Sequence, residues 1–286
     1  MNTLIRLTLR AFPDLPVEAE TLIPENVTGR NQTEIESLPL LVGNRHERVG
    51  DFFEVDVTDE TSTGPVREEE CLATLLLKGD FSRFKRLGER MSAGRMIVDG
   101  PVGFHAGAYM NGGLLTILGD AGDYLGAHMK GGVIEVRGAA GHFAGAAYRG
   151  YSHGMNGGTI VIHGNAGQML GVRMRRGLIA VRGCCGDGPG FGMKAGTVLV
   201  GGLSGVRAGA IMSRGTVILL TPPPELMPTF LFDCTYRPPV WPLLLATLTR
   251  IDFHLPEIGR EAMFDRYCGD VTEGGGGEIL IYRSGL

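Results

Sequence analysis

Five arginines form the group of charged side chains in this sequence that is best suited to bind a ligand. They are Arg149, Arg173, Arg175, Arg176 and Arg182, and Arg137 could extend the group. Guanidinium groups attract carboxylates and phosphates, and a row of them concentrates positive potential. We therefore expect a strip that attracts a polyanionic ligand, although a solvated face or a set of salt bridges between subunits would use the same residues.

The other reactive residue types lack the spacing that catalysis or metal binding needs. The seven histidines form no HExxH or HxxxH motif, although His105 and His142 hold related places in neighbouring repeats, and no GxSxG motif is present. The cysteines contain no CxxC pair, and adjacent Cys184 and Cys185 would point to opposite sides of a strand. We expect no metal site and no catalytic residue in this chain. The five cysteines are Cys71, Cys184, Cys185, Cys234 and Cys268.

A repeat of 19 residues runs through the middle of the chain. Seven methionines mark it at successive spacings of 19, 19, 26, 19, 19 and 19, and a glycine follows three residues after each of them. Because the glycines recur with the repeat and lack GxGxxG spacing, we interpret them as bends of the backbone, where glycine tolerates positive φ, and not as a phosphate loop. The methionines are Met91, Met110, Met129, Met155, Met174, Met193 and Met212.

Each repeat glycine is followed by a five-residue segment with the pattern of a β-strand. Its second and fourth residues are apolar in all seven repeats, as in LLTIL (114–118) and VIEVR (133–137), so they should share one buried face. One strand per short turn predicts an all-β fold, a right-handed parallel β-helix built as a solenoid of 19-residue turns. We place the solenoid at 75–220, between an N-terminal strand and loop segment (1–74) packed on it and a C-terminal extension (221–286).

Two features of the repeat region are expected to matter for its surface. The single long spacing is a seven-residue insertion within AGAAYRGYSHGM (144–155), which is either a tolerated surface loop or a contact with a partner. The central outward residue of each strand is often apolar, so we expect this strip to be covered by residues 1–70, by residues 221–286 or by another subunit. The strip comprises Ile97, Thr116, Glu135, Val161, Ala180, Leu199 and Ile218.

The net charge and the lengths of the apolar runs argue against nucleic-acid-binding and membrane-spanning proteins. The net charge of −4 gives no general reason to expect nucleic acid as a partner. The longest apolar run, VWPLLLATL (240–248), is far too short to span a bilayer, and the alternating N-terminus is not a signal peptide. We expect a soluble protein of the reducing cytoplasm.

The GxxGxxxGxxMxxG turns resemble two related families, the C-terminal domain of the glutamate synthase large subunit and the C subunit of formylmethanofuran dehydrogenase. The flanking segments are similar to the second family: PVEAETLIPEN (16–26), LPLLVGNRHERVGDFFEV (38–55) and the closing FDRYCGD and GGGGEILIY. The resemblance therefore covers essentially the whole chain. It implies a subunit of an enzyme complex whose catalytic residues belong to other chains.

The second family has two branches, and the preference for arginine over lysine favours the bacterial one. There the resemblance implies a formyltransferase/hydrolase complex that moves a formyl group from tetrahydromethanopterin to a methanofuran-type carrier and releases formate, in formaldehyde oxidation of methylotrophic one-carbon metabolism. The expected partners are hydrolase-like and formyltransferase-like chains, with no cofactor in this chain. A glutamate-rich tail on the carrier would suit the arginine group. The alternatives are the C subunit of a molybdenum or tungsten dehydrogenase that reduces carbon dioxide in methanogenesis, and a glutamate synthase-type domain.

Overall fold

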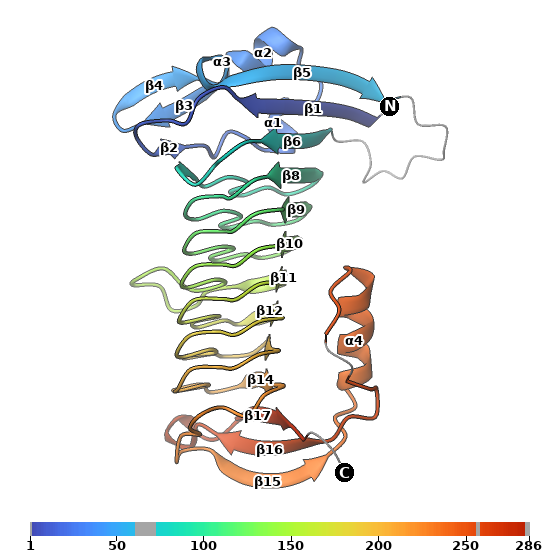
Figure 1. Cartoon of the computed structure of the whole chain (residues 1–286). Coiled ribbons are helices and arrows are strands. Elements are labelled where there is room, and N and C mark those ends of the chain that lie inside the picture. The colour runs from blue at the N-terminus through green and yellow to red at the C-terminus, as the bar shows by residue number, and fades with distance from the viewer. Residues whose placement is uncertain (1, 61–72, 256–257, 284–286) are drawn as a thin grey trace.

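The computed structural model describes residues 2–60, 73–255 and 258–283, so Cys71 lies outside the described residues. Among these residues, thirteen strands form one sheet, and most of its neighbouring strands run parallel. Figure 1 shows its central strands stacked one above another, each joined to the next by a loop that returns around the back. The prediction of a mainly β solenoid is confirmed.

The strands of the solenoid stack in register along the repeat. Leu115 of one strand pairs with Ile134 of the next, which pairs with Ile160 and then Ile179. The 26-residue step therefore leaves the strand register unchanged, because the extra residues leave the stack as a loop. The stacked strands are β6 (Thr74–Lys78), β8 (Arg95–Asp99), β9 (Leu114–Ile117), β10 (Val133–Val136), β11 (Asn156–Ile162), β12 (Arg176–Val181), β13 (Thr197–Val200) and β14 (Gly215–Leu219).

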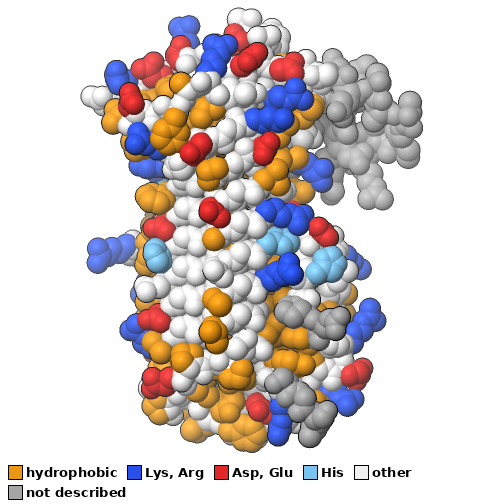
Figure 2. Space-filling view, viewed as in Figure 1, with side chains coloured by type: hydrophobic (Ala, Val, Ile, Leu, Met, Phe, Trp, Pro, Cys, Tyr) orange, Lys and Arg blue, Asp and Glu red, His pale blue; other side chains and the backbone are white. Residues whose placement is uncertain are grey.

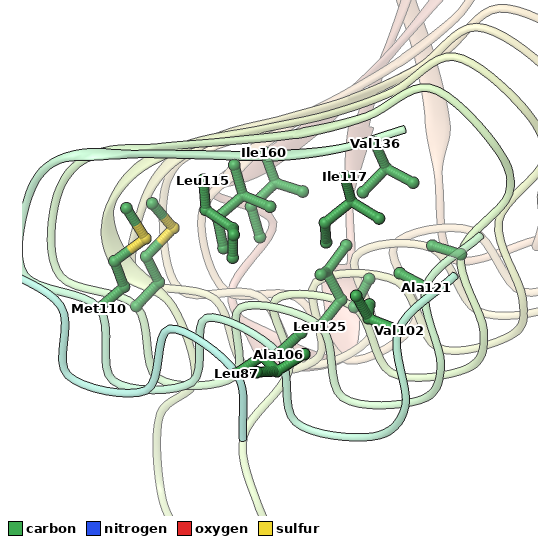
Figure 3. Close-up of a cluster of buried hydrophobic side chains, with 14 of the residues drawn as sticks. Leu87, Val102, Ala106, Met110, Leu115, Ile117, Ala121, Leu125, Val136 and Ile160 are labelled. Atoms are coloured by element: carbon green, nitrogen blue, oxygen red, sulfur yellow. The ribbon is translucent and has the colours of Figure 1, made fainter. Parts of the chain in front are cut away.

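The core of the solenoid is the column of side chains that the repeat pattern predicted. The second and fourth strand residues are fully buried in all seven repeats, and so are the seven repeat methionines. Figure 3 shows Met110, Leu115 and Ile117 pointing into the coil toward Leu125 and Ala106 of the opposite wall. A second line of single parallel bridges, from Phe81 to Cys185, ties the coils together away from the main sheet. Cys184 is exposed where Cys185 is buried, as their adjacency predicted.

The N-terminal residues close one end of the coil. The strand β1 (Asn2–Leu9) pairs parallel with β6 and antiparallel with β5 (Phe53–Glu60), and the rings of Phe53, Phe81 and Phe84 pack together at the first coil. A small second sheet lies beside them. Its strands are β2 (Val17–Glu18), β3 (Pro39–Val42), β4 (Arg45–Arg48) and β7 (Phe84–Lys85), and the short helices are α1 (Pro24–Val27), α2 (Gln32–Glu36) and α3 (Val49–Phe52).

The C-terminal residues close the other end and also return along the side of the stack. The strand β17 (Gly277–Tyr282) extends β14 in parallel, and β16 (Phe264–Gly269) and β15 (Leu231–Tyr236) follow antiparallel. A short 3-10 helix, η2 (Val271–Glu273), lies between β16 and β17. The helix α4 (Trp241–Arg250) runs beside the coils (Figure 1). In the sequence, this segment stands out only as an apolar run.

The helix α4 covers about half of the apolar outer strip. Strip residues of β11 to β14, from Val161 to Ile218, are buried together with Trp241, Leu244 and Leu248 of the helix. Nearer the N-terminus, Ile97 and Thr116 of the same strip stay partly exposed. Of the expected covers, the C-terminal segment therefore occupies the lower part of the strip. The division of the chain at residues 74 and 220 stays a prediction.

Candidate docking surfaces

The wall of the solenoid away from the main sheet carries two rows of outward aromatic side chains. Their backbone is left-handed, with φ near +60° at His105, Tyr124 and Phe143 in one row and at Tyr109 and His128 in the other. The repeat forces this conformation at fixed positions, so the side chains of successive coils stack. Ring centroids are 5.4 Å apart for His105 and Tyr124, 4.9 Å for Tyr124 and Phe143, and 5.0 Å for Tyr109 and His128.

Tyr148, the first residue of the insertion, fills the space between these two rows. Its ring lies 5.3 Å from His105 and 5.2 Å from Tyr124 in the first row, and 5.8 Å from Tyr109 and 5.0 Å from His128 in the second. Its backbone N–H donates to Nε2 of His128 at 2.9 Å, and its hydroxyl lies 3.0 Å from Nδ1 of His105. The insertion is therefore anchored on the coil surface at its base.

Burial sets the charge of this aromatic group. It lowers the pKa of His105 and of His128 and raises the pKa of the Tyr148 hydroxyl well above its ordinary value. The electrostatic influence of His153 and Lys130 lowers the pKa of His128 further. A neutral His128 with a free Nε2 is what the Tyr148 N–H needs as an acceptor. The group is thus a neutral anchor.

The tip of the insertion is exposed and basic. Arg149, Tyr151, Ser152 and His153 all face solvent, and Tyr151 retains 53% of its accessible surface. Nη1 of Arg173 donates to the carbonyl of Tyr151 at 2.6 Å, and the Tyr151 ring meets His128 edge-on at 4.8 Å. The loop projects sideways from the stack near β11 (Figure 1), and a basic side chain extends beyond the outline of the molecule at that height (Figure 2).

The structure divides the five candidate arginines between two edges of the sheet. Arg173, Arg175 and Arg176 lie on the stretch that enters β12, and Arg173 contacts the loop that carries Arg149. Arg182 follows the other end of β12, about 20 Å away at the usual rise per strand residue. All five are exposed, and no described carboxylate forms an ion pair with any of them. Four of the five thus share one flank.

Arg137, which could have extended the group of five arginines, belongs to a separate cluster of ion pairs. Its guanidinium contacts Glu135 at 2.8 Å and Asp252 at 3.2 Å, and Nε2 of His163 lies 3.2 Å from the same Glu135 oxygen. Burial, more than its charged neighbours, lowers the pKa of His163. These contacts tie the segment after α4 to the side of the coil. The strand pattern predicts Glu135 on the outer strip but does not indicate its partners.

The structure of the described residues places no group of three or more metal-ligating side chains together. His105 and His142 are not partners: His105 faces Tyr148, whereas Nδ1 of His142 accepts the N–H of Gln168 at 3.0 Å. A cavity of about 360 Å³ at the N-terminal end is lined by Glu18, Lys85 and Arg86, and the Glu18 carboxylate pairs with Lys85 at 3.6 Å and with Arg86 at 3.2 Å. No helix in the described part of the chain is long and apolar enough to cross a bilayer.

Comparison with known proteins was made by family model, by sequence and by structure. No family model matches the chain. The C subunit of the tungsten-containing formylmethanofuran dehydrogenase 2 of Methanothermobacter marburgensis is 34% identical over 104 residues, which is 36% of each chain. The C subunit of the molybdenum-containing formylmethanofuran dehydrogenase 1 of Methanosarcina barkeri is 37% identical over 92 residues, 32% of this chain and 28% of that one. The match thus spans about a third of the length of these curated relatives.

The structural similarity extends much further along the chain. A chain in the crystal structure of the formyltransferase/hydrolase complex (FhcABCD) from Methylorubrum extorquens, in complex with methylofuran, superposes with a TM-score of 0.83 at 32% identity. The superposition covers 96% of this chain and 98% of that chain, so it includes the flanking segments as well as the solenoid. The chain belongs to the family of formylmethanofuran dehydrogenase C subunits.

Proposed function

We propose that this chain is the structural subunit of a cytoplasmic formyltransferase/hydrolase complex. The complex would transfer the formyl group of formyl-tetrahydromethanopterin to a methanofuran-type carrier and release formate, in formaldehyde oxidation. This chain would dock the hydrolase-like and formyltransferase-like chains and take no part in the chemistry. The similarity over 96% of the chain to a chain of the Methylorubrum complex carries the proposal.

The fold suits a structural role. Fully buried, in-register columns make a rigid rod, and each coil adds about 4.8 Å to its length. We propose that the rod is a right-handed parallel β-helix. It holds the partly exposed part of the outer strip, at Ile97 and Thr116, in fixed relation to the arginine flank, which is the flank that carries Arg149, Arg173, Arg175 and Arg176. Partner chains bound at these places would be held at a set distance and angle.

A second candidate function comes from the names of the curated relatives. They are subunits of tungsten- and molybdenum-containing formylmethanofuran dehydrogenases, which favours a role in a complex that reduces carbon dioxide. Both candidates give this chain a structural role, but they differ in the partners.

Purification of the native complex, with identification of the chains that co-purify, separates the two candidates. We expect formyltransferase-like and hydrolase-like chains. A molybdopterin-binding chain with iron–sulfur partners would instead favour the dehydrogenase. Recovery of this chain alone as an active monomer would contradict the structural role in either complex.

Within the proposed complex, the arginine flank would attract the carrier. Arg173, Arg175 and Arg176 are free of ion pairs with described carboxylates and could draw in a polyanionic tail. Charge reversal at Arg173 and Arg176 should raise the KM for the carrier in the assembled complex and flatten its dependence on salt. An Arg30→Glu/Arg45→Glu double variant, which reverses the same number of charges on the exposed N-terminal cap, is the matched control. An unchanged KM and salt dependence would contradict this role.

A further inference from the structure

The insertion loop at 148–154 is built as a rigid projection. The neck is closed by the N–H of Met155, which donates to the carbonyl of Gly145 at 3.0 Å, and by the N–H of Gly154, which donates to the carbonyl of Arg173 at 2.8 Å. At the base, Tyr148 is wedged between four rings and held through His105 and His128. An insertion that is merely tolerated on the surface would not need such an anchor.

The tip offers the side chains that protein interfaces favour. Tyr151 presents a large ring that packs edge-on against His128, and Arg173 holds its backbone carbonyl, so little conformational entropy is lost when it binds. Arg149 stands two residues away without an ion pair among the described residues. Tyrosine and arginine are the residue types that most often dominate binding energy at interfaces.

The charge around the loop indicates which kind of partner surface would bind the loop. Between Glu135 and Asp187 the sequence contains no aspartate or glutamate but six arginines. Four of these arginines, Arg149, Arg173, Arg175 and Arg176, lie on the loop or on the flank beside it, so a positive band lies at its base. Since the whole chain carries −4, the remainder of the molecule carries −10. A partner with an acidic surface would therefore be attracted to this band and repelled elsewhere.

We propose that residues 148–154 form a docking knob whose Tyr151 and Arg149 insert into an acid-rimmed pocket on another protein chain of the same complex. The inference rests on the proposed function, because it takes the partner from the chains that assemble with this one. The Tyr151 ring fills the pocket, and Arg149 pairs with carboxylates at its rim. The knob thereby fixes the rotation of the solenoid about its own axis relative to that partner.

The test compares knob variants in reconstitution with the partner chains identified by co-purification. The double variant Arg149→Glu/Tyr151→Ala should bind the partner at least about tenfold more weakly, with an unchanged circular dichroism spectrum and melting temperature. Tyr151→Phe keeps the ring and should bind like wild type, as should the distant Arg30→Glu. Binding of the double variant within about twofold of wild type would overturn the proposal.

A photo-crosslinking phenylalanine analogue at position 151 gives an independent readout in the assembled complex. We expect a crosslink to one partner chain, on a peptide rich in aspartate and glutamate. Crosslinks within this chain alone, in a complex that assembles normally, would overturn the knob while leaving the proposed function intact. A double variant that assembles normally but has a raised KM for the carrier would also overturn it, assigning the loop to the carrier. A wild-type chain that binds no chain of the complex would refute both.

Discussion

At the scale of single residues, the glycines of the repeat are required for shape. Gly126 has a φ of +59°, and a Cβ at this position would lie 2.5 Å from Cδ1 of Ile160 in the core. Gly29 has a similar φ of +75°, but a Cβ there would meet no described atom within 4 Å. The two positions therefore separate the cost of backbone strain from the cost of crowding.

We expect Gly126→Ala to lower the free energy of unfolding by roughly 2–4 kcal/mol, because left-handed strain and core crowding add together. Gly29→Ala should cost only about 1–2 kcal/mol, the strain alone. Urea denaturation of the two variants measures both changes. Equal losses would show that the coil accommodates a methyl group at Gly126.

The anchor of the insertion should depend on pH through His128. Because burial lowers the pKa of His128, the unfolded chain binds more protons than the folded chain in the interval between the folded and ordinary values. The anchor should thus be fully stable above about pH 6.5 and weaken as pH falls through this interval, where protonated Nε2 can no longer accept the Tyr148 N–H.

Hydrogen exchange of the Tyr148 amide, corrected for the intrinsic rate at each pH, measures this weakening. Its protection should fall between pH 7.5 and pH 5.5 (about one unit on either side of the ordinary histidine value). His128→Gln cannot be protonated and should remove most of the pH dependence. Protection that stays constant in wild type would mean that His128 is not the acceptor in solution.

At the scale of elements, α4 turns an open face of the sheet into core. Trp241 is almost completely buried against Phe264, and its indole N–H donates to the carbonyl of Gly259 at 3.0 Å. Leu243 on the opposite side of the helix retains 69% of its accessible surface. The helix is thus held by one face only.

Trp241→Ala should destabilise the C-terminal region by about 3–5 kcal/mol and expose the strip from Val161 to Ile218 to solvent. Leu243→Ala should change the stability by less than about 0.5 kcal/mol. Limited proteolysis and thermal unfolding give the two readouts. A Trp241→Ala variant as resistant to protease as wild type would show that α4 is not held by this contact.

The sequence predicted some elements better than others for identifiable reasons. Strand positions followed from the alternation of residues such as Leu115 and Ile117, because each strand repeats the pattern of its neighbours. The helix α4 occurs once and lacks that redundancy, so its buried side, Trp241, Leu244 and Leu248, was seen only as an apolar run. A unique element offers no second copy against which to compare it.

The site shows the same contrast. Placing Arg176 at the start of a strand and Arg182 after its end would have separated them by the rise per residue alone. The anchor was harder to foresee, because Tyr148 interrupts the repeat and contacts residues as far away as His105. The outward left-handed positions become visible only when the coils are aligned in space.

At the scale of the whole molecule, both ends of the stack reverse the direction of the chain. The antiparallel strands β5 and β15 form the two outermost edges of the sheet, beyond the parallel coils. A parallel coil of a second molecule would meet a strand that runs the wrong way and has the wrong hydrogen-bond spacing. The terminal segments therefore block end-to-end association. They prevent the stack from growing into a fibre and leave the sides of the rod as the surfaces for assembly.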